Sequence, residues 1–328
     1  MASMKDGKFT NDPLITSDED GEFKRSESTF RGTIDPDEVE KNRYHLYVSY
    51  ACPWAHRTMI VRELKMLQEY ISVSVTDPYM GARGWTFSHP WDPKYLAEVY
   101  TDTDEHYTGK ITVPVLWDKT QKTIINNESS EIIRILNSDF NLVSASDIDL
   151  YPEDLRSEID KINDKIYENV NNGVYKTGFA SNQEAYEKNC RKLFQTLNEL
   201  EMLLGQRPFL AGDYATEADI RLFTTLIRFD TVYYSHFKCN LRQIKDYHHL
   251  YNYLKSLFQV PEFQTTCHFD HIKQHYYQSH TMLNPSGIIP LGPELDLLSD
   301  HDRGEVKFYR TTSHEKEWPT SNIFNPRV

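Results

Sequence analysis

Cys52 is the residue of this sequence best placed to act as a nucleophile. It lies between a predicted strand over Tyr44–Ser49 and a predicted helix whose first turn contains Pro53. Backbone N–H groups and the dipole at a helix N-terminus favour a thiolate, and they lower the pKa of a cysteine from about 8.5 to about 3.5–7.5. We therefore interpret Cys52 as a thiolate that attacks sulfur, rather than as a small buried core residue. The other cysteines have no such setting and are predicted to be structural: Cys190, Cys239 and Cys267.

The residues after Cys52 decide how a mixed disulfide on it would be released. The motif reads Cys52-Pro53-Trp54-Ala55, whereas a dithiol oxidoreductase would need a second cysteine at position 55. Because Ala55 cannot resolve a mixed disulfide, the second thiol must come from solution. Glutathione is the expected donor, as a co-substrate rather than a bound cofactor.

Pro114 interrupts a predicted strand over Ile111–Trp117, where proline removes a hydrogen-bond donor from the ladder. It could simply lie on an edge strand. We favour the alternative that the Val113–Pro114 peptide is cis and turns the backbone of Val113 toward a ligand beside Cys52.

The segment Asn127-Glu128-Ser129-Ser130 precedes an apolar helix. Its side chains could simply cap that helix. A helix N-terminus can also bind a carboxylate through its N–H groups, while Glu128 could hold an ammonium group. The γ-glutamyl end of glutathione carries both charges on one carbon.

Four histidines lie close together near the end of the predicted helical region: His268, His271, His275 and His280. His271 and His275 are four residues apart and could hold a metal on one helical face. No carboxylate or cysteine completes a familiar metal-binding signature, so we expect no metal site. Tyr276 and Tyr277, in the same stretch, are the more interesting residues.

The elements predicted around Cys52 form a βαβ unit. Strand alternation over Tyr44–Ser49, helical spacing of apolar residues over 60–67 and strand alternation over Ile71–Thr76 follow in that order. Such a unit implies a parallel pair of strands. The composition of residues 77–109 predicts a long loop that could contain a short helix. Strands over Ile111–Trp117 and Thr123–Ile125 and the helix after Asn127-Glu128-Ser129-Ser130 complete this half.

From about residue 150 the apolar period changes to 3.6, which predicts a helical bundle. The expected helices lie near 155–166, 193–204, 222–229 and 250–257. Thr216 and Asp219 form a capping-box variant at the start of the third of these helices. The fold class is therefore α/β followed by all-α.

Composition excludes several classes of function. The 328 residues carry 49 acidic and 36 basic side chains, a formal charge of −13, which argues against nucleic acid or an anionic membrane as a partner. No apolar run approaches the roughly 20 residues that span a bilayer. The N-terminus lacks the apolar region of a secretory signal, so we expect a cytoplasmic protein with reduced cysteines.

A series of motifs in this order resembles the glutathionyl-hydroquinone reductases, the Xi class of glutathione transferases. The motifs are Y-A-C-P-W-A-H-R-T (50–58), G-W-T-F (84–87), T-V-P-V-L-W-D (112–118), N-E-S-S-E-I-I-R (127–134), N-N-G-V-Y-K-T-G-F-A (171–180), E-A-D-I-R-L (217–222), R-F-D-T-V-Y (228–233), H-F-K-C (236–239) and N-P-S-G-I-I-P-L-G-P (284–293). The resemblance implies a homodimer whose subunit has a thioredoxin-like domain followed by an all-helical domain. The expected boundaries are an extended segment 1–40, a glutathione-binding domain 41–145, a helical domain 150–282 and an irregular tail 283–328 that wraps the surface.

The resemblance also implies an activity and a set of site residues. Cys52 would attack the sulfur of a glutathionyl-hydroquinone, releasing hydroquinone, and a second glutathione would release the enzyme. Tyr175 would give a proton to, or take one from, the departing aryl group. Glutathione would bind at Trp85, Val113, Pro114, Glu128 and Ser129. Tyr175, Tyr233 and Tyr276 would surround the quinol pocket, and Tyr233 and Tyr276 would also stabilise the Cys52 thiolate.

Two alternative functions remain beside the reduction of glutathionyl-hydroquinones. One is a broader omega-like thioltransferase or dehydroascorbate reductase, because omega-class transferases share a similar cysteine motif. The other is a non-enzymatic ligand-binding protein that keeps the transferase fold.

Overall fold

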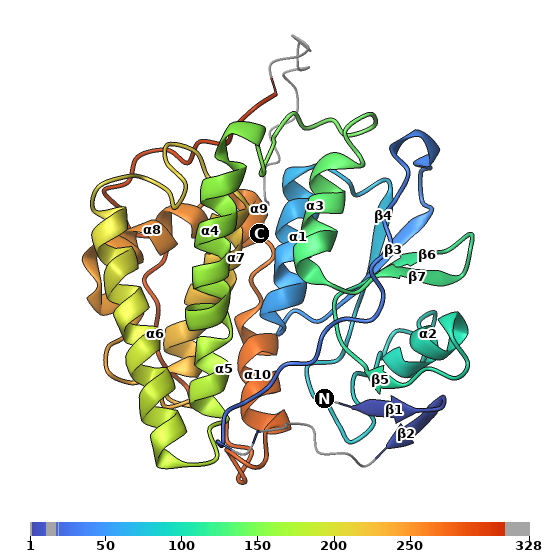
Figure 1. Ribbon diagram of the computed structural model, residues 1–328, viewed down its shortest axis with the longest axis horizontal. Helices are drawn as coiled ribbons and strands as arrows, with labels where there is room; N and C mark the ends of the chain where they lie inside the picture. Colours follow the sequence, from blue (N-terminus) through green and yellow to red (C-terminus); the bar gives the residue numbers. More distant parts are fainter. Residues whose placement is uncertain (1, 11–17, 19, 312–328) are drawn as a thin grey trace, which may run out of the picture.

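The computed structural model describes residues 2–10, 18 and 20–311 of the chain. Figure 1 shows two parts side by side: a sheet with its helices on the right and a bundle of helices on the left. One hydrophobic core runs through both parts without interruption. The pairing of an α/β part with an all-helical part confirms the predicted fold class, while the predicted domain boundaries stay predictions.

The central sheet has four strands in the order β4-β3-β6-β7. β3 pairs with β4 in parallel, as the βαβ pattern predicts, and β6 pairs antiparallel with both β3 and β7. This is the strand order of a thioredoxin-like domain. The strands are β3 (Tyr44–Val48), β4 (Ile71–Val75), β6 (Val115–Asp118) and β7 (Thr123–Asn126).

Three helices accompany the sheet. α1 (Pro53–Leu64) follows β3 and packs against α3 (Ser129–Ser138), which begins directly after the Asn127-Glu128 segment. The predicted long loop contains α2 (Leu96–Thr103). A short 3-10 helix, Pro36–Glu38, precedes β3.

The strand expected over Ile111–Trp117 is wrong at its start. The ladder begins at Val115, because Pro114 has no N–H group to donate and Ile111 instead bonds through its N–H to the carbonyl of Ala2.

The N-terminal segment is more than the extended lead-in that its polar composition predicts. β1 (Ser3–Lys5) and β2 (Lys8–Thr10) form a hairpin, and β1 also pairs with β5 (Gly109–Lys110) in a second small sheet. Strands of two or three residues are too short to show a readable alternation, which is why the sequence pattern missed them.

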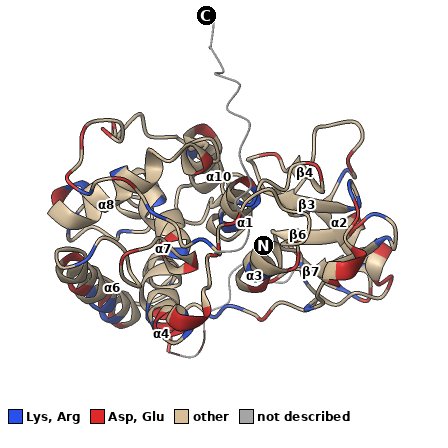
Figure 2. Ribbon diagram, turned by 90° about the horizontal axis from the view of Figure 1, so that it is seen from above, with Lys and Arg blue, Asp and Glu red and all other residues tan. Residues whose placement is uncertain are grey.

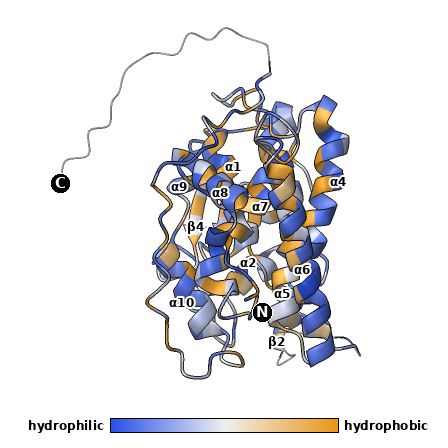
Figure 3. Cartoon of the chain, turned by 90° about the vertical axis from the view of Figure 1, so that its left-hand side faces the viewer, coloured by the Kyte–Doolittle hydropathy of each residue, from blue (hydrophilic) through white to orange (hydrophobic). Residues whose placement is uncertain are grey.

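The four predicted helices of the helical half are all present. Two of them, α4 and α6, bury one face, whereas every residue of α7 is buried. Figure 3 shows hydrophilic and hydrophobic residues sharing α4 and α6, and Figure 2 shows charges of both signs along α6. The capping box of Thr216 and Asp219 at the start of α7 is confirmed. The elements are Glu153–Leu155 (3-10), α4 (Arg156–Ile166), η3 (Tyr167–Asn171, π-helical), α5 (Gly173–Gly178), α6 (Gln183–Leu204), α7 (Glu217–Arg228), η4 (Phe229–Tyr233, π-helical), Ile244–Asp246 (3-10), α8 (His248–Phe258), α9 (Pro261–Gln264) and α10 (Phe269–Ser279).

The described part of the tail, residues 283–311, runs over the helical half, as expected. The Arg303 guanidinium donates to the carbonyl of Leu204 (2.6 Å), and the Ala215 N–H donates to the carbonyl of Lys307 (2.7 Å). The rest of the predicted tail, 312–328, lies outside the described residues. Within the described chain, no helix is both long and apolar enough to span a membrane.

Candidate active site

Cys52 occupies the position that the sequence predicts, at the junction of β3 and α1. It is the N-cap residue of α1, and Pro53 is the first residue of the helix. The side chain is half-buried, with its Sγ atom 3.6 Å from the carbonyl oxygen of Val113. The thiol therefore borders a pocket instead of filling the core.

The expectation of a lowered pKa at Cys52 is wrong for the protein without a ligand. Burial raises the pKa of the thiol. The N–H groups of Ala55 and Trp54 and the positive charges of Arg228 and Arg25 lower it, but they offset the effect of burial only in part. The helix N-terminus is present as predicted, but its lowering effect on the thiol pKa is smaller than the raising effect of burial.

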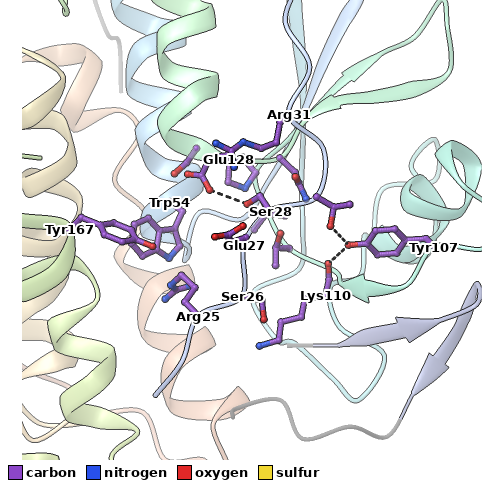
Figure 4. A pocket seen from close by; sticks show the side chains of 16 residues that line it. Arg25, Ser26, Glu27, Ser28, Arg31, Trp54, Tyr107, Lys110, Glu128 and Tyr167 are labelled. Carbon is purple, nitrogen blue, oxygen red and sulfur yellow. Dashed lines mark hydrogen bonds between the residues drawn. The ribbon is translucent and has the colours of Figure 1, made fainter. Parts of the chain in front are cut away.

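Figure 4 shows a polar pocket that borders the Cys52 region, because Val113, whose carbonyl oxygen lies 3.6 Å from the Cys52 sulfur, is one of its lining residues. The predicted cis peptide between Val113 and Pro114 is confirmed, and both residues line this pocket. We call it the polar pocket and define it by its lining residues: Arg25, Ser26, Glu27, Ser28, Thr29, Arg31, Trp54, Tyr107, Lys110, Thr112, Val113, Pro114, Asn127, Glu128, Ser129 and Tyr167.

Glu128 and Ser129 meet the polar pocket at the N-terminus of α3. Glu128 is the N-cap residue, and its carboxylate accepts hydrogen bonds from the N–H (3.1 Å) and hydroxyl (2.9 Å) of Ser130 and from the hydroxyl of Ser28 (3.0 Å). Helix N–H groups with an adjacent carboxylate can receive a carboxylate and an ammonium group together. Both proposed roles of this segment, capping and ligand binding, fit the same geometry.

A second, aromatic pocket is lined by Cys52 itself. Its walls come from both halves of the chain, and it contains Tyr175 and Tyr276 of the predicted quinol pocket. Its lining residues are Phe23, Arg25, Cys52, Pro53, Trp54, Met80, Trp85, Tyr175, Phe179, His275, Tyr276, His280 and Met282. Only Arg25 and Trp54 line both pockets, so these two residues mark the boundary between them.

The three tyrosines singled out by the sequence meet in one hydrogen-bonded chain. The hydroxyl of Tyr276 lies 2.5 Å from that of Tyr175 and 3.1 Å from that of Tyr233. Burial raises the pKa of all three hydroxyls, so each keeps its proton at neutral pH. Tyr233 itself is fully buried and does not line the pocket, but it contacts both tyrosines that do: its hydroxyl lies near that of Tyr276, and its ring packs on Tyr175 at 6.0 Å between centroids.

Two π-helical turns help to position these tyrosines. Tyr175 lies in α5 just after η3, and Tyr233 is the last residue of η4. A π-turn inserts an extra residue into a helix and shifts the side chains that follow it, and such turns are frequent at functional sites. The apolar spacing of the sequence gives no sign of either turn.

Trp85 lies in the aromatic pocket and not in the polar pocket. Its ring stacks on His275 at 4.7 Å between centroids. The other four residues matched to glutathione binding line the polar pocket: Val113, Pro114, Glu128 and Ser129.

The histidine cluster is divided among different environments. His275 is buried against Trp85 and hydrogen-bonded through Nδ1 to the carbonyl of Pro78 (3.0 Å), whereas His271 packs on Tyr50. Within the described residues no group of three or more His, Cys, Asp or Glu side chains is arranged to hold a metal.

Two buried arginines form hydrogen bonds near the junction that contains Cys52. Arg228 of α7 donates to the carbonyls of Ala51 (2.9 Å) and Tyr50 (3.0 Å), the two residues before Cys52. Arg57 of α1 donates to Asn171 Oδ1 at 3.0 Å. The sequence carries Arg228 within the R-F-D-T-V-Y motif, but the local pattern gives no sign of this contact with a loop 177 residues away.

Sequence reasoning missed the contribution of residues 21–32 to both pockets. Phe23 lines the aromatic pocket, and the run from Arg25 to Thr29 lines the polar one. The only signal in the sequence is that Phe23 and Phe30 stand as isolated aromatic residues in a polar stretch.

Comparisons with known proteins agree with this geometry. The chain matches the family model of the glutathione S-transferase N-terminal domain over residues 51–139 and that of the C-terminal domain over 183–256. It is 47% identical to glutathionyl-hydroquinone reductase YqjG of Escherichia coli (strain K12), over 94% of this chain and 100% of that protein. It is 50% identical to glutathionyl-hydroquinone reductase PcpF of Sphingobium chlorophenolicum, over 89% of this chain and 96% of the relative.

Solved structures give the same result. The glutathione-bound structure of YqjG from Escherichia coli K-12 superposes with a TM-score of 0.82 at 49% identity, over 84% of this chain and 96% of that one. The Xi glutathione transferase of Phanerochaete chrysosporium superposes with a TM-score of 0.84 at 49% identity, over 88% and 97% of the two chains. The chain therefore belongs to the glutathionyl-hydroquinone reductase family, the Xi class of the glutathione transferases.

Proposed function

We propose that this protein uses glutathione to reduce glutathionyl-hydroquinones to hydroquinones through a mixed disulfide on Cys52. The observation that carries the proposal is one half-buried thiol that lines the aromatic pocket and lies 3.6 Å from the carbonyl oxygen of Val113, a lining residue of the polar pocket. The polar pocket suits a zwitterionic peptide, and the aromatic pocket suits a ring with polar edges. A substrate that joins glutathione to a hydroquinone through sulfur would place its reacting bond beside Cys52.

The first half-reaction breaks the bond between the sulfur and the ring. Direct displacement would leave the electron pair on an aryl carbon, which is a poor leaving group. If the ring first moves a hydroxyl proton to the carbon that bears sulfur, the released pair passes instead to the ring oxygen. The Cys52 thiolate then bonds to the glutathione sulfur, and the hydroquinone departs as a phenolate.

Tyr175 is the proposed proton donor to that phenolate. It lines the aromatic pocket, and burial raises the pKa of its hydroxyl, so that it holds a proton to donate. Tyr276 and Tyr233 extend the chain of hydroxyls behind it, which can replace the proton and stabilise the charge.

The second half-reaction restores Cys52. A second glutathione attacks the mixed disulfide as its thiolate, forming glutathione disulfide and returning the electron pair to the Cys52 sulfur. Free cysteines are absent from both pocket linings apart from Cys52, and position 55 is Ala, so an external thiol is required.

The polar pocket is proposed to hold the glutathione moiety in both half-reactions. The N-terminus of α3 would bind the γ-glutamyl carboxylate, and Glu128 its ammonium group. The backbone of Val113, beside Cys52, would align the cysteinyl part, with Pro114 and Ser129 as neighbours. The location of Trp85 in the aromatic pocket favours a contact near the glutathione–aryl junction.

The test compares two substrates. Steady-state turnover with a glutathionyl-hydroquinone and with a simple glutathione mixed disulfide separates this activity from that of an omega-like thioltransferase. We expect kcat/KM to be higher for the glutathionyl-hydroquinone. A preference for the mixed disulfide or for dehydroascorbate would favour the alternative, and absence of turnover with bound glutathione would favour a ligand-binding protein.

The homodimer implied by the family resemblance belongs to this proposal, and so does the cytoplasmic location. Sedimentation equilibrium tests the first directly: a mass near twice 38.6 kDa is expected, and a mass of one chain would contradict it.

A further inference from the structure

Residues 21–32 form a strap that crosses the mouth of the site, and Figure 1 shows it as the dark-blue segment between the bundle and the sheet. At its first end the strap is fixed to the helical half. The Ser181 N–H donates to the carbonyl of Gly21 (3.1 Å), and Lys188 forms an ion pair with Glu22 (2.6 Å). The ring of Phe23 then stacks on Tyr175 at 6.2 Å between centroids.

At its second end the strap is fixed to the sheet half. The N–H of Phe30 donates to Asn127 Oδ1 (3.0 Å), and the N–H of Gly32 donates to the carbonyl of Ile125 (2.8 Å). Two residues before Phe30, the hydroxyl of Ser28 donates to the carboxylate of Glu128, as Figure 4 shows. Because both ends are held, the residues between them keep a defined place over the cleft.

Arg25 is the residue of the strap that points to the reacting centre. Its Nε donates to Asn172 Oδ1 at 2.8 Å. The centre of its guanidinium lies 4.7 Å from the ring centroid of Trp54 and 5.0 Å from that of Tyr175. The guanidinium therefore packs against the ring of Trp54, two residues after Cys52, and against the ring of Tyr175, the proposed proton donor.

The charge of Arg25 is not neutralised. Among the described residues no carboxylate lies within 4.0 Å of its guanidinium, and its two terminal nitrogens have no protein hydrogen-bond partner. The neighbouring Lys24 points away, with an exposed side chain paired to Asp18. A half-buried cation held against aromatic faces, with donors open to a cleft, is arranged to receive an anion.

We propose that Arg25 is a catalytic residue, which contacts the reacting end of the substrate and stabilises the negative charge as it passes from the Cys52 sulfur to the departing aryl oxygen. It is one of the two residues that line both pockets, which is where the sulfur–carbon bond would lie. Its positive charge lowers the pKa of both Cys52 and Tyr175 against the effect of burial. The role in the aryl step rests on the proposed function, whereas the role at the Cys52 thiolate does not.

The first test measures the Cys52 thiolate without any aryl substrate. The rate of alkylation by iodoacetamide, followed against pH, reports the pKa of Cys52. In Arg25→Gln we expect that pKa to rise by about one unit, so that alkylation at pH 7 slows about tenfold. Lys24→Gln removes a neighbouring cation that faces solvent, and we expect it to leave the profile unchanged.

A second variant keeps the guanidinium and cancels its charge. Asn172→Asp places a carboxylate where the amide oxygen now accepts from Arg25. We expect slower alkylation here too, which a purely structural role of Arg25 would not produce. If Arg25→Gln fails to fold, as judged by circular dichroism, this variant carries the test.

Turnover measures the aryl step. We expect Arg25→Gln to lower kcat about 100-fold, with a larger loss for hydroquinones of higher phenol pKa, and Arg25→Lys to lie between it and the unchanged protein. An unchanged alkylation profile in both Arg25→Gln and Asn172→Asp would overturn the inference. So would a loss confined to the KM for glutathione, which would make Arg25 a peptide-binding residue. Should the unchanged protein not turn over glutathionyl-hydroquinones, the proposed function fails while the alkylation result still decides the role of Arg25 at Cys52.

Discussion

The polar and aromatic pockets both lie near one sulfur atom and differ in nearly every physical respect. The polar pocket has a volume of about 310 Å³ and is built from the strap, the Lys110–Pro114 segment and the N-terminus of α3. The aromatic pocket has a volume of about 80 Å³ and is walled by rings, two methionines and the tyrosine chain. The polar pocket can therefore bind a flexible charged peptide, and the aromatic pocket can surround a flat ring.

Under the proposed function, this difference divides the work: the polar pocket binds the glutathione part of the substrate, and the aromatic pocket surrounds the ring from which the sulfur is removed. Binding groups in the polar pocket act equally on substrate and transition state, so their loss should raise KM. Hydroxyls in the aromatic pocket act on charge that develops only when the sulfur–carbon bond breaks, so their loss should lower kcat. The predictions below test this division.

The largest effect is expected at the Cys52 sulfur, which lines the aromatic pocket and lies beside Val113 of the polar pocket. Cys52→Ala should lower kcat more than about 10³-fold, because no other group can form the mixed disulfide. Glutathione should still bind, since the polar pocket is intact, and calorimetry measures this separately. Cys267→Ser is the matched control: burial raises the pKa of the Cys267 thiol to about 12, so its loss should leave turnover unchanged. Equal turnover of the Cys52 variant would refute the mechanism.

Tyr175→Phe tests the aromatic pocket alone. Removing a proton donor should lower kcat about 10²–10³-fold with little change in the KM for glutathione. Tyr233→Phe is the comparison variant: Tyr233 does not line the aromatic pocket and only supports the two tyrosines that do, so a smaller loss is expected there. A larger loss in Tyr233→Phe would place the proton donor elsewhere.

Glu128→Gln tests the polar pocket alone. Loss of a charged hydrogen-bond partner costs about 1.5–3 kcal/mol, which raises the KM for glutathione about 10- to 100-fold and leaves kcat nearly unchanged. Ser28→Ala removes the strap's hydrogen bond to the same carboxylate and keeps the charge, so it reports the purely structural part of the effect. A fall in kcat with constant KM would contradict the division between the pockets.

The smallest effect concerns stability in acid. Burial lowers the pKa of His275, in the aromatic pocket, to about 4. The unfolded chain, with a histidine pKa of about 6.5, then binds more protons, so the free energy of unfolding falls as pH drops from about 6.5 toward 4. We expect His275 to contribute on the order of 1–3 kcal/mol to this fall.

Urea unfolding at pH 7 and pH 5 measures that contribution. His275→Asn should reduce the loss of stability between the two pH values, whereas His248→Asn, which alters an exposed histidine, should not. If His275→Asn loses as much stability in acid as the unchanged chain, other groups account for the fall.

Local sequence was sufficient to predict where Cys52 lies, the helix that follows it and the turn that faces it. The N-cap position of Cys52, the cis bond before Pro114 and the capping box of α7 each depend on neighbours within a few residues. The long helices were predictable too, because burying one face imposes a period of 3.6. The motif Cys52-Pro53-Trp54-Ala55 also predicted a thiol donor from solution, and that prediction belongs to the proposed function.

What only the tertiary structure decided is how those residues meet and what their surroundings do to them. Tyr175 and Tyr276 are 101 residues apart, Arg25 and Asn172 are 147 apart, and no local pattern couples either pair. The pKa of Cys52 moved in the direction opposite to the local prediction. The physical reason is that a helix N-terminus is a local feature, whereas desolvation depends on every segment that packs around the thiol.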